Sequence, residues 1–197
     1  MKVLLHTCCG PCATHCVRKL RELGHEPVLF FSNANICSQR EFNRRLLAAR
    51  TLADQEGVLM LVDPPDHKEW RQVVATGVER APEGGERCER CFRYSLGRTL
   101  QALGESGCEA FTTSLTVSPH KRSETLLRIG SELGGAKFLP VNFKKENGYA
   151  KSVARANALG LYRQNFCGCE FSRASLLQRI LRSCKRLFSA PRNIRRD

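Results

Sequence analysis

Long hydrophobic runs are absent from this sequence. No apolar stretch approaches the roughly 20 residues that a membrane-spanning helix needs, so we expect no membrane association. The opening residues 1–5 (MKVLL) reach His6 and Cys8 too soon to form the core of a signal peptide. Without a membrane span or a signal peptide, we expect a cytoplasmic protein. Internal repeats and low-complexity segments are also missing.

Acidic residues are scarce relative to basic ones. The chain has 19 Asp and Glu against 32 Lys and Arg, which gives a net charge of +13. Such an excess favours a polyanionic partner, because basic side chains displace counterions from phosphates. Residues 179–197 hold seven basic residues and one acidic residue and so supply +6 of this charge. A solvated basic tail explains that stretch equally well, but the rest of the chain remains at +7.

Strand and helix patterns alternate along the 197 residues, 42% of which are hydrophobic. We predict one α/β domain over residues 1–175 and a basic C-terminal helix or tail over 176–197. The predicted strands are 3–6, 26–31, 58–62, 110–115 and 137–143. The predicted helices are 11–23, 38–53, 69–75, 88–103, 123–133, 149–159 and 172–188. Ser38 and Glu41 match a capping box at the start of the second helix. Five strands separated by helices predict a mostly parallel, Rossmann-like sheet, whose sites form beyond the carboxyl ends of the strands.

Eleven cysteines are many for a chain without a secretion signal. The odd number argues against a disulfide framework and favours metal binding or redox chemistry. The first cluster, Cys8, Cys9 and Cys12, follows the first predicted strand and opens a helix. Free N–H groups and partial positive charge at a helix start stabilise thiolates, which are both nucleophiles and metal ligands.

Two further clusters follow. Cys88 and Cys91 form a CxxC at a helix start, and Cys167 and Cys169 form a CxC around a glycine. Four such thiolates suit either a [4Fe–4S] cluster or a structural zinc ion. Seven clustered cysteines exceed one tetrahedral site, which indicates a second metal or redox-active thiols. The remaining cysteines are predicted to be small packed side chains: Cys16, Cys37, Cys108 and Cys184.

The segment Cys9 to Cys12 also has the CGPC spacing of thioredoxins on a strand–turn–helix. A dithiol oxidoreductase using Cys9 and Cys12 is therefore an alternative function. A zinc-stabilised RNA-binding module without catalysis is a second one. Against the dithiol alternative, Cys8 stands where thioredoxins usually carry an aromatic residue, and the other two cysteine pairs would have no use.

Five segments together carry a much more specific signal than any single motif. They are residues 6–12 (HTCCGPC), 83–92 (EGGERCERCF), 112–121 (TTSLTVSPHK), 143–145 (FKK) and 161–172 (LYRQNFCGCEFS). In this order they resemble the QueH-type, cobalamin-independent epoxyqueuosine reductases, and the resemblance covers roughly residues 1 to 175.

The resemblance implies a Rossmann-like core related to the HUP group and an enzyme that reduces epoxyqueuosine to queuosine at the wobble position of tRNA. It also implies a [4Fe–4S] cluster, a nearby mononuclear metal, expected to be iron, and an electron donor that the sequence does not identify. The family's metal-ligand motifs carry over to seven positions: Cys8, Cys9, Cys12, Cys88, Cys91, Cys167 and Cys169. We assign Cys88, Cys91, Cys167 and one of Cys8 or Cys9 to the cluster, and the others to the lone metal.

The chain departs from the family pattern at two places, and the first of them leaves the composition of the second metal site open. The position at which some relatives carry a carboxylate matches Cys12, so Asp63 and Asp66 are reserve candidates, with turn capping as their alternative role. In the loop after the second strand, the family's usual proline is replaced by Ala34, and Cys37 is unusual.

Epoxide removal consumes two protons, for which four side chains are candidate donors: His6, His120, Lys121 and Tyr162. Phosphate contacts are predicted at Lys121, Arg122, Lys144, Lys145 and Arg163. The aromatic rings of Phe92, Tyr149, Tyr162 and Phe166 are candidates for stacking on splayed bases, with core packing as their alternative role.

Overall fold

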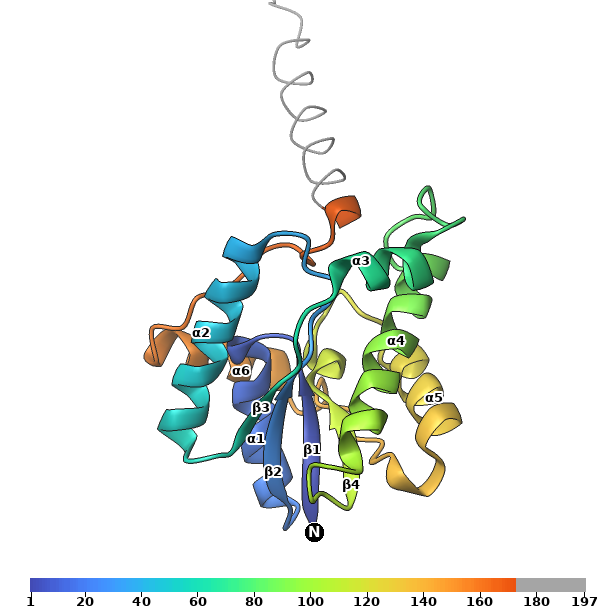
Figure 1. Ribbon diagram of the computed structural model, residues 1–197. Helices are drawn as coiled ribbons and strands as arrows, with labels where there is room; N and C mark the ends of the chain where they lie inside the picture. Colours follow the sequence, from blue (N-terminus) through green and yellow to red (C-terminus); the bar gives the residue numbers. More distant parts are fainter. Residues whose placement is uncertain (173–197) are drawn as a thin grey trace, which may run out of the picture.

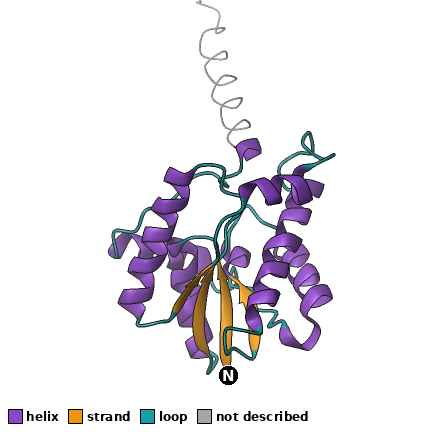
Figure 2. Cartoon of the chain, viewed as in Figure 1, coloured by secondary structure: helices purple, strands orange, loops and turns teal. Residues whose placement is uncertain are grey.

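The computed structural model describes residues 1–172, which build a parallel sheet with helices on both faces (Figures 1 and 2). The sheet has four strands: β1 (Lys2–Thr7), β2 (Glu26–Phe31), β3 (Met60–Val62) and β4 (Ala110–Thr113). Their order is β3-β2-β1-β4, and every pairing is parallel. The predicted α/β, Rossmann-like class is confirmed.

Strand β1 lies inside the sheet and is buried on both faces, as its continuous apolar run requires. Val3 and Leu5 pack on one face with helices α1 (Gly10–Glu22), α2 (Gln39–Glu56) and α6 (Gly148–Ala158). Leu4 packs on the other face with α4 (Glu86–Leu103) and α5 (Ser123–Gly134). The alternation of side chains along the strand therefore divides the core into two layers.

The predicted fifth strand is wrong. In residues 137–143 only Phe138 forms an isolated bridge, to Phe111. The Leu139 N–H donates to the Phe111 carbonyl at 2.8 Å, but the next residue is Pro140, which has no N–H. The Val141 N–H then donates locally to the Leu139 carbonyl at 2.9 Å, which ends the pairing.

Strand β4 is shorter than predicted, because residues 114–117 turn into the 3-10 helix η2 (Ser114–Val117). The Thr113 hydroxyl accepts the Leu115 N–H at 3.1 Å and so caps this turn. A second 3-10 turn, η3 (Gly135–Lys137), follows α5.

The loops at the carboxyl edge of the sheet lie at the top of Figure 1, together with α3 (His67–Trp70) and the π-helical turn η1 (Arg71–Ala75). Within residues 1–172, no helix has both the length and the apolar character needed to cross a bilayer. The predicted helix 172–188, Cys184 and the tail 176–197 lie almost wholly outside the described residues.

Candidate metal centre

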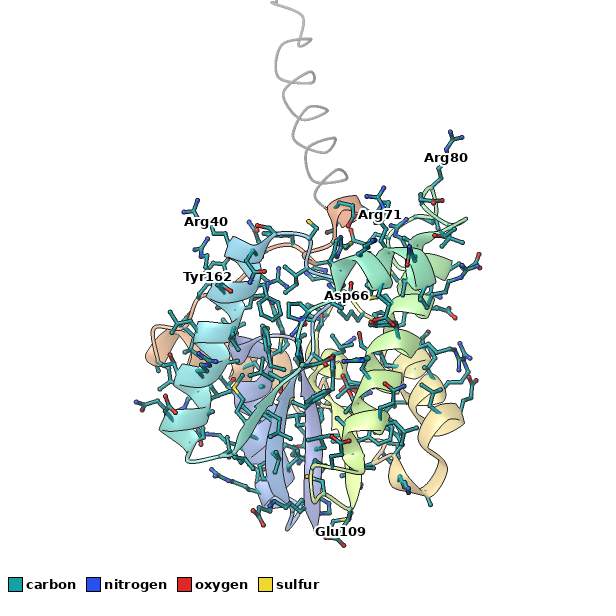
Figure 3. The ribbon with its side chains drawn as sticks, viewed as in Figure 1. Arg40, Asp66, Arg71, Arg80, Glu109 and Tyr162 are labelled. Carbon is teal, nitrogen blue, oxygen red and sulfur yellow. The ribbon has the colours of Figure 1, made fainter. Side chains whose placement is uncertain are left out.

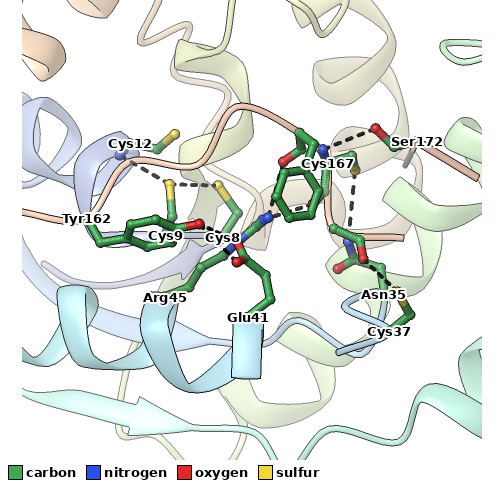
Figure 4. A network of polar contacts seen from close by, with 12 residues as sticks. Cys8, Cys9, Cys12, Asn35, Cys37, Glu41, Arg45, Tyr162, Cys167 and Ser172 are labelled. Atoms are coloured by element: carbon green, nitrogen blue, oxygen red, sulfur yellow. Dashed lines mark hydrogen bonds and ion pairs between the residues drawn. The ribbon is translucent and has the colours of Figure 1, made fainter. Parts of the chain in front are cut away.

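Three thiols meet where β1 ends and α1 begins (Figure 4). The sulfurs of Cys8, Cys9 and Cys12 all lie within 4.8 Å of one another. Cys9 is the N-cap of α1, and its sulfur accepts the Cys12 backbone N–H at 3.4 Å. A side chain at Gly10 would bring its Cβ to 2.4 Å from the Ala48 carbonyl oxygen of α2. Glycine thus lets the start of α1, with its thiols, lie directly against α2.

The three thiols share protons unequally. Donation from the Cys12 thiol and then from the Cys8 thiol holds the pKa of Cys9 well below its usual range, although burial opposes this. The contact of Cys12 with Cys8, followed by its contact with Cys9 and by burial, raises the pKa of Cys12. The contact with Cys12 lowers the pKa of Cys8, but donation to Cys9 together with burial raises it to about 11. This arrangement stabilises one thiolate at Cys9 with two neighbouring thiols, a donor set suited to a thiophilic metal.

The thiol triangle opens into a cavity of about 570 Å³. Its lining includes five of the seven predicted ligands: Cys8, Cys9, Cys12, Cys91 and Cys167. Cys88 and Cys169 are not among the lining residues. Cys88 accepts the Gly84 N–H at 3.2 Å, and Cys169 is buried in an apolar cluster.

The second group of thiols comes from two distant segments. Cys88 and Cys91 lie in the first turns of α4, whereas Cys167 and Cys169 lie in the loop after α6 and flank Gly168, whose φ is +114°. Within the described part of the chain, only Cys8, Cys9 and Cys12 form a group of three or more ligand atoms inside 4.8 Å. The CxxC and CxC pairs therefore flank the cavity without closing into such a group.

The thiols of this second group differ in pKa. The Cys169 thiol, followed by the Lys121 ammonium, lowers the pKa of Cys167 to about 5 against the effect of burial. Burial raises the pKa of Cys91 to about 12. In turn, the pKa of Lys121 is raised by Cys167 first and by Cys8, Cys91 and Cys88 as well. The Lys121 ammonium group thus interacts electrostatically with cysteines of all three motifs.

A buried ion pair holds the Cys167 loop, and the sequence prediction missed it. Arg45 of α2 donates to Glu41 through Nε at 2.7 Å, to the Cys167 carbonyl through Nη1 at 2.8 Å and to the Phe166 carbonyl through Nη2 at 3.1 Å (Figure 4). The side chains of Arg45 and Glu41 are 3% and 5% exposed. Tyr162 also donates to Glu41, at 2.9 Å. An acid–base pair four residues apart on an apolar helix face was the available signal.

The capping-box prediction is accordingly wrong. Ser38 precedes α2, but its side chain makes no capping hydrogen bond. Glu41 turns inward because Arg45 and Tyr162 bind its carboxylate.

The loop is fastened at three more points. The Cys37 thiol donates to the Gly168 carbonyl at 3.3 Å. Ser172 Oγ accepts the Cys167 N–H at 3.2 Å, and Asn35 Nδ2 lies 3.9 Å from the Cys167 sulfur. Cys37, which departs from the family pattern, thus contacts the backbone between two predicted metal ligands. Cys16 is fully buried, as predicted, and donates to the Cys12 carbonyl.

The four predicted proton donors are placed differently. His6, His120 and Lys121 line the cavity, whereas Tyr162 is not among the lining residues and donates to Glu41. The His6 ring is buried, with Nδ1 2.9 Å from Thr113 Oγ1 and Nε2 3.1 Å from the Ser32 carbonyl. Burial lowers the pKa of His6. Both ring nitrogens are engaged, so proton transfer from His6 would break one of these bonds.

The predicted phosphate-binding residues surround the same opening in part. Lys121 and Arg163 line the cavity. Arg122 and Lys145 are exposed, and Lys144 Nζ donates to the Lys121 carbonyl at 2.8 Å. Figure 3 shows further basic side chains toward this edge at Arg40, Arg71 and Arg80. Of the predicted stacking residues, Phe92, Tyr149 and Phe166 line the cavity.

The reserve carboxylates do not line the cavity. Asp63 is buried, accepts the Ser32 hydroxyl at 2.7 Å and pairs with Arg98. Asp66 caps α3 by accepting the Glu69 N–H at 2.8 Å, its alternative predicted role.

The site is thus a group of thiols at the carboxyl edge of a parallel α/β sheet, and Cys8, Cys9 and Cys12 offer three ligand atoms suited to a metal ion. A family model described as "Epoxyqueuosine reductase QueH" matches residues 3–175. The chain belongs to this QueH family.

Individual relatives agree with this assignment. The epoxyqueuosine reductase QueH of Streptococcus pyogenes serotype M1 is 34% identical over 180 residues, which cover 86% of this chain and 69% of the relative. That of Thermotoga maritima is 34% identical over 175 residues, or 86% of this chain and 89% of the relative. That of Staphylococcus epidermidis is 31% identical over 183 residues, or 87% and 76%. The match does not favour the dithiol oxidoreductase or the zinc-stabilised RNA-binding module.

Proposed function

We propose that this protein reduces epoxyqueuosine to queuosine in the wobble position of tRNA, in the cytoplasm. The reaction breaks the two C–O bonds of the epoxide, forms a C=C bond and releases the oxygen as water. It consumes two electrons, from a donor still to be identified, and two protons. The observation that carries this proposal is the triangle of Cys8, Cys9 and Cys12 at the cavity, in a chain of the QueH family.

The donor set supports a thiolate-bound cofactor. Five of the seven cysteines of the three motifs line one cavity, and these five already exceed what one tetrahedral site uses. We propose that they hold a [4Fe–4S] cluster and a mononuclear metal, iron. The cluster ligands would be Cys88, Cys91, Cys167 and one of Cys8 or Cys9. The bound groups would supply single electrons and a Lewis acid for the epoxide oxygen.

The chain's own groups would position the substrate and move protons. Lys121 lines the cavity and is positively charged beside the cysteines, so its Nζ is the proposed proton donor to the departing oxygen. His6 would hold the end of β1 through Thr113 and the Ser32 carbonyl. Phe166 is available to stack on an extruded base, and Arg163 to contact phosphate.

Metal analysis tests the cofactor part of this proposal. Protein purified without oxygen should contain about five irons with sulfide and show a broad visible absorption that bleaches on reduction. Cys9→Ser should lose iron and turnover of epoxyqueuosine tRNA, whereas Cys108→Ser, at a half-buried cysteine outside the cavity lining, should keep both. Zinc alone, or no metal, in protein never exposed to air would contradict the proposal.

Salt dependence tests the RNA part. If Arg163 and its basic neighbours contact phosphates, the affinity for substrate tRNA must decline as salt concentration rises. Arg163→Gln should reduce that slope by about one counterion. An affinity independent of salt would contradict tRNA binding at this edge.

A further inference from the structure

Trp70 is the single tryptophan of the chain and lies against the second group of thiols. It ends α3 and is 1% exposed. Its apolar cluster includes Cys169, and the half-buried Cys91 and Cys167 pack against that cluster. Trp70 therefore belongs to the apolar cluster that contains or contacts three predicted metal ligands.

The indole N–H of Trp70 is buried and has no hydrogen-bond partner among the described residues. Such groups are rare in folded proteins, and each needs a reason. The indole is a donor only, so the group it serves must be an acceptor. The acceptors that pack in the same cluster as the indole are the sulfurs of Cys91, Cys167 and Cys169. Cys91 is the one of the three on which Trp70 acts, because burial raises the pKa of its thiol and Trp70 lowers it.

A neutral thiol is a weak acceptor, whereas a metal-bound thiolate carries negative charge and accepts much more strongly. The neutral Cys91 thiol therefore offers the buried N–H only a weak acceptor. Metal binding at Cys91 would turn this sulfur into a strong acceptor.

The surroundings fix the indole in place. The His67 ring stacks on it with centroids 5.3 Å apart and an angle of 17°. His67 Nδ1 lies 2.8 Å from the Ala34 carbonyl, and Nε2 lies 3.3 Å from the carboxylate of Glu170, the residue after Cys169. The helix then changes to a π-helical turn at Arg71–Ala75, a form that often occurs at functional sites.

We propose that Trp70 is a positioning residue of the metal centre, whose indole N–H donates to the Cys91 sulfur when the CxxC and CxC thiols hold a metal. The inference rests on the metal binding in the proposed function. It assigns to α3 and η1 a role as the outer support of the site, because partners of this kind orient metal ligands and tune the metal.

The first test uses Co²⁺ as the probe, on the reduced, metal-free full chain with Cys9→Ser and Cys12→Ser, so that binding reports the second thiol group. Trp70→Phe keeps an aromatic ring, although a smaller one, and removes the N–H. The affinity for Co²⁺, followed by its thiolate absorption against a competing chelator, should fall about tenfold. Tyr94→Phe is the matched control, because Tyr94 belongs to the same cluster but its hydroxyl binds Glu69. An unchanged affinity in Trp70→Phe, or an equal loss in Tyr94→Phe, would overturn the proposal.

The fluorescence of Trp70 provides a second test that needs no change at Trp70. Co²⁺ should quench its emission in the Cys9→Ser/Cys12→Ser chain but not in a Cys91→Ser/Cys167→Ser chain. Absence of quenching in the first chain overturns the proposal even if Trp70→Phe fails to fold.

The reduction potential separates a hydrogen bond from simple packing. In iron-loaded protein, loss of an N–H···S bond should make the potential more negative, and an unchanged potential would overturn the proposal. Failure of tRNA turnover together with a clear Trp70 effect would refute the proposed reaction alone. Normal turnover without a Trp70 effect would refute this inference alone.

Discussion

Replacing Arg45 with methionine would remove the ion pair that fastens the Cys167 loop to α2. In the structure, the guanidinium makes three hydrogen bonds of 2.7 to 3.1 Å, and its side chain is 3% exposed. After the substitution, the buried Glu41 carboxylate would keep only the Tyr162 hydroxyl. The Cys167 and Phe166 carbonyls would each lose the Arg45 donor.

The expected cost follows from that burial. Breaking a buried pair by removing one partner costs about 3–5 kcal/mol, because the remaining charge is left in a poorly solvated place. Since folded domains are stable by only about 5–15 kcal/mol, this is a large fraction of the total. The loss should appear as a lower denaturant midpoint at constant slope in reducing urea unfolding.

A double variant separates the pair's energy from its positioning role. Glu41→Met combined with Arg45→Met removes both charges, so most of the lost stability should return. The Cys167 loop would still lack its donors, so alkylation of Cys167 in metal-free protein should remain faster than in the wild type. Arg128→Met is the control, because Arg128 pairs with Glu132 on the surface and should matter little. An Arg45→Met midpoint equal to that of the wild type would refute the reasoning.

Two further predictions concern backbone fit and charge. Gly10→Ala should destabilise the fold by more than about 1 kcal/mol, because its Cβ would overlap the Ala48 carbonyl. Gly97→Ala is the control and should stabilise the fold by about 0.5–1 kcal/mol, because a Cβ at Gly97 in α4 meets open space. Equal urea midpoints for the two variants would contradict the close contact at Gly10. In metal-free protein the lowered pKa of Cys167 means that its thiolate persists down to about pH 5, so its alkylation rate should fall only as the pH drops through about 5. Cys169→Ala should raise that pKa and slow alkylation at pH 6, and a wild-type midpoint near that of an ordinary thiol, about 8.5, would contradict the assignment.

The features that the sequence predicted well depend on local patterns. The buried run of β1, the proline in the first turn of α1 and the three-cysteine turn between them specify a strand–turn–helix with thiols at its start. Residues 26–31 likewise form β2 at the predicted positions. In these cases periodicity and helix-start chemistry agree with the tertiary fold.

The predictions failed where tertiary contacts outweigh local preference. Residues 137–143 have a strand-like composition, but Pro140 interrupts the ladder after one bridge. Glu41 has the spacing of a capping residue, yet it is recruited by Arg45 and by Tyr162, which is 121 residues away. No local pattern contains such a partner.

The role proposed for Trp70 was also beyond sequence reasoning. A lone tryptophan near a short helix is indistinguishable from core packing in the sequence. Only its burial against Cys91, with an unpartnered N–H, suggests another purpose.

The separation of the thiols along the chain constrains when the site can exist. Cys8 and Cys12 leave the ribosome early, Cys88 and Cys91 follow about 80 residues later, and Cys167 and Cys169 come last. Closing loops of this length costs conformational entropy, which only the completed sheet and helices repay. A nascent chain that ends before residue 167 therefore offers a thiol triangle but no CxC loop. If the seven cysteines hold the proposed metals, insertion into the complete site must wait until synthesis has passed that loop, so maturation would follow folding.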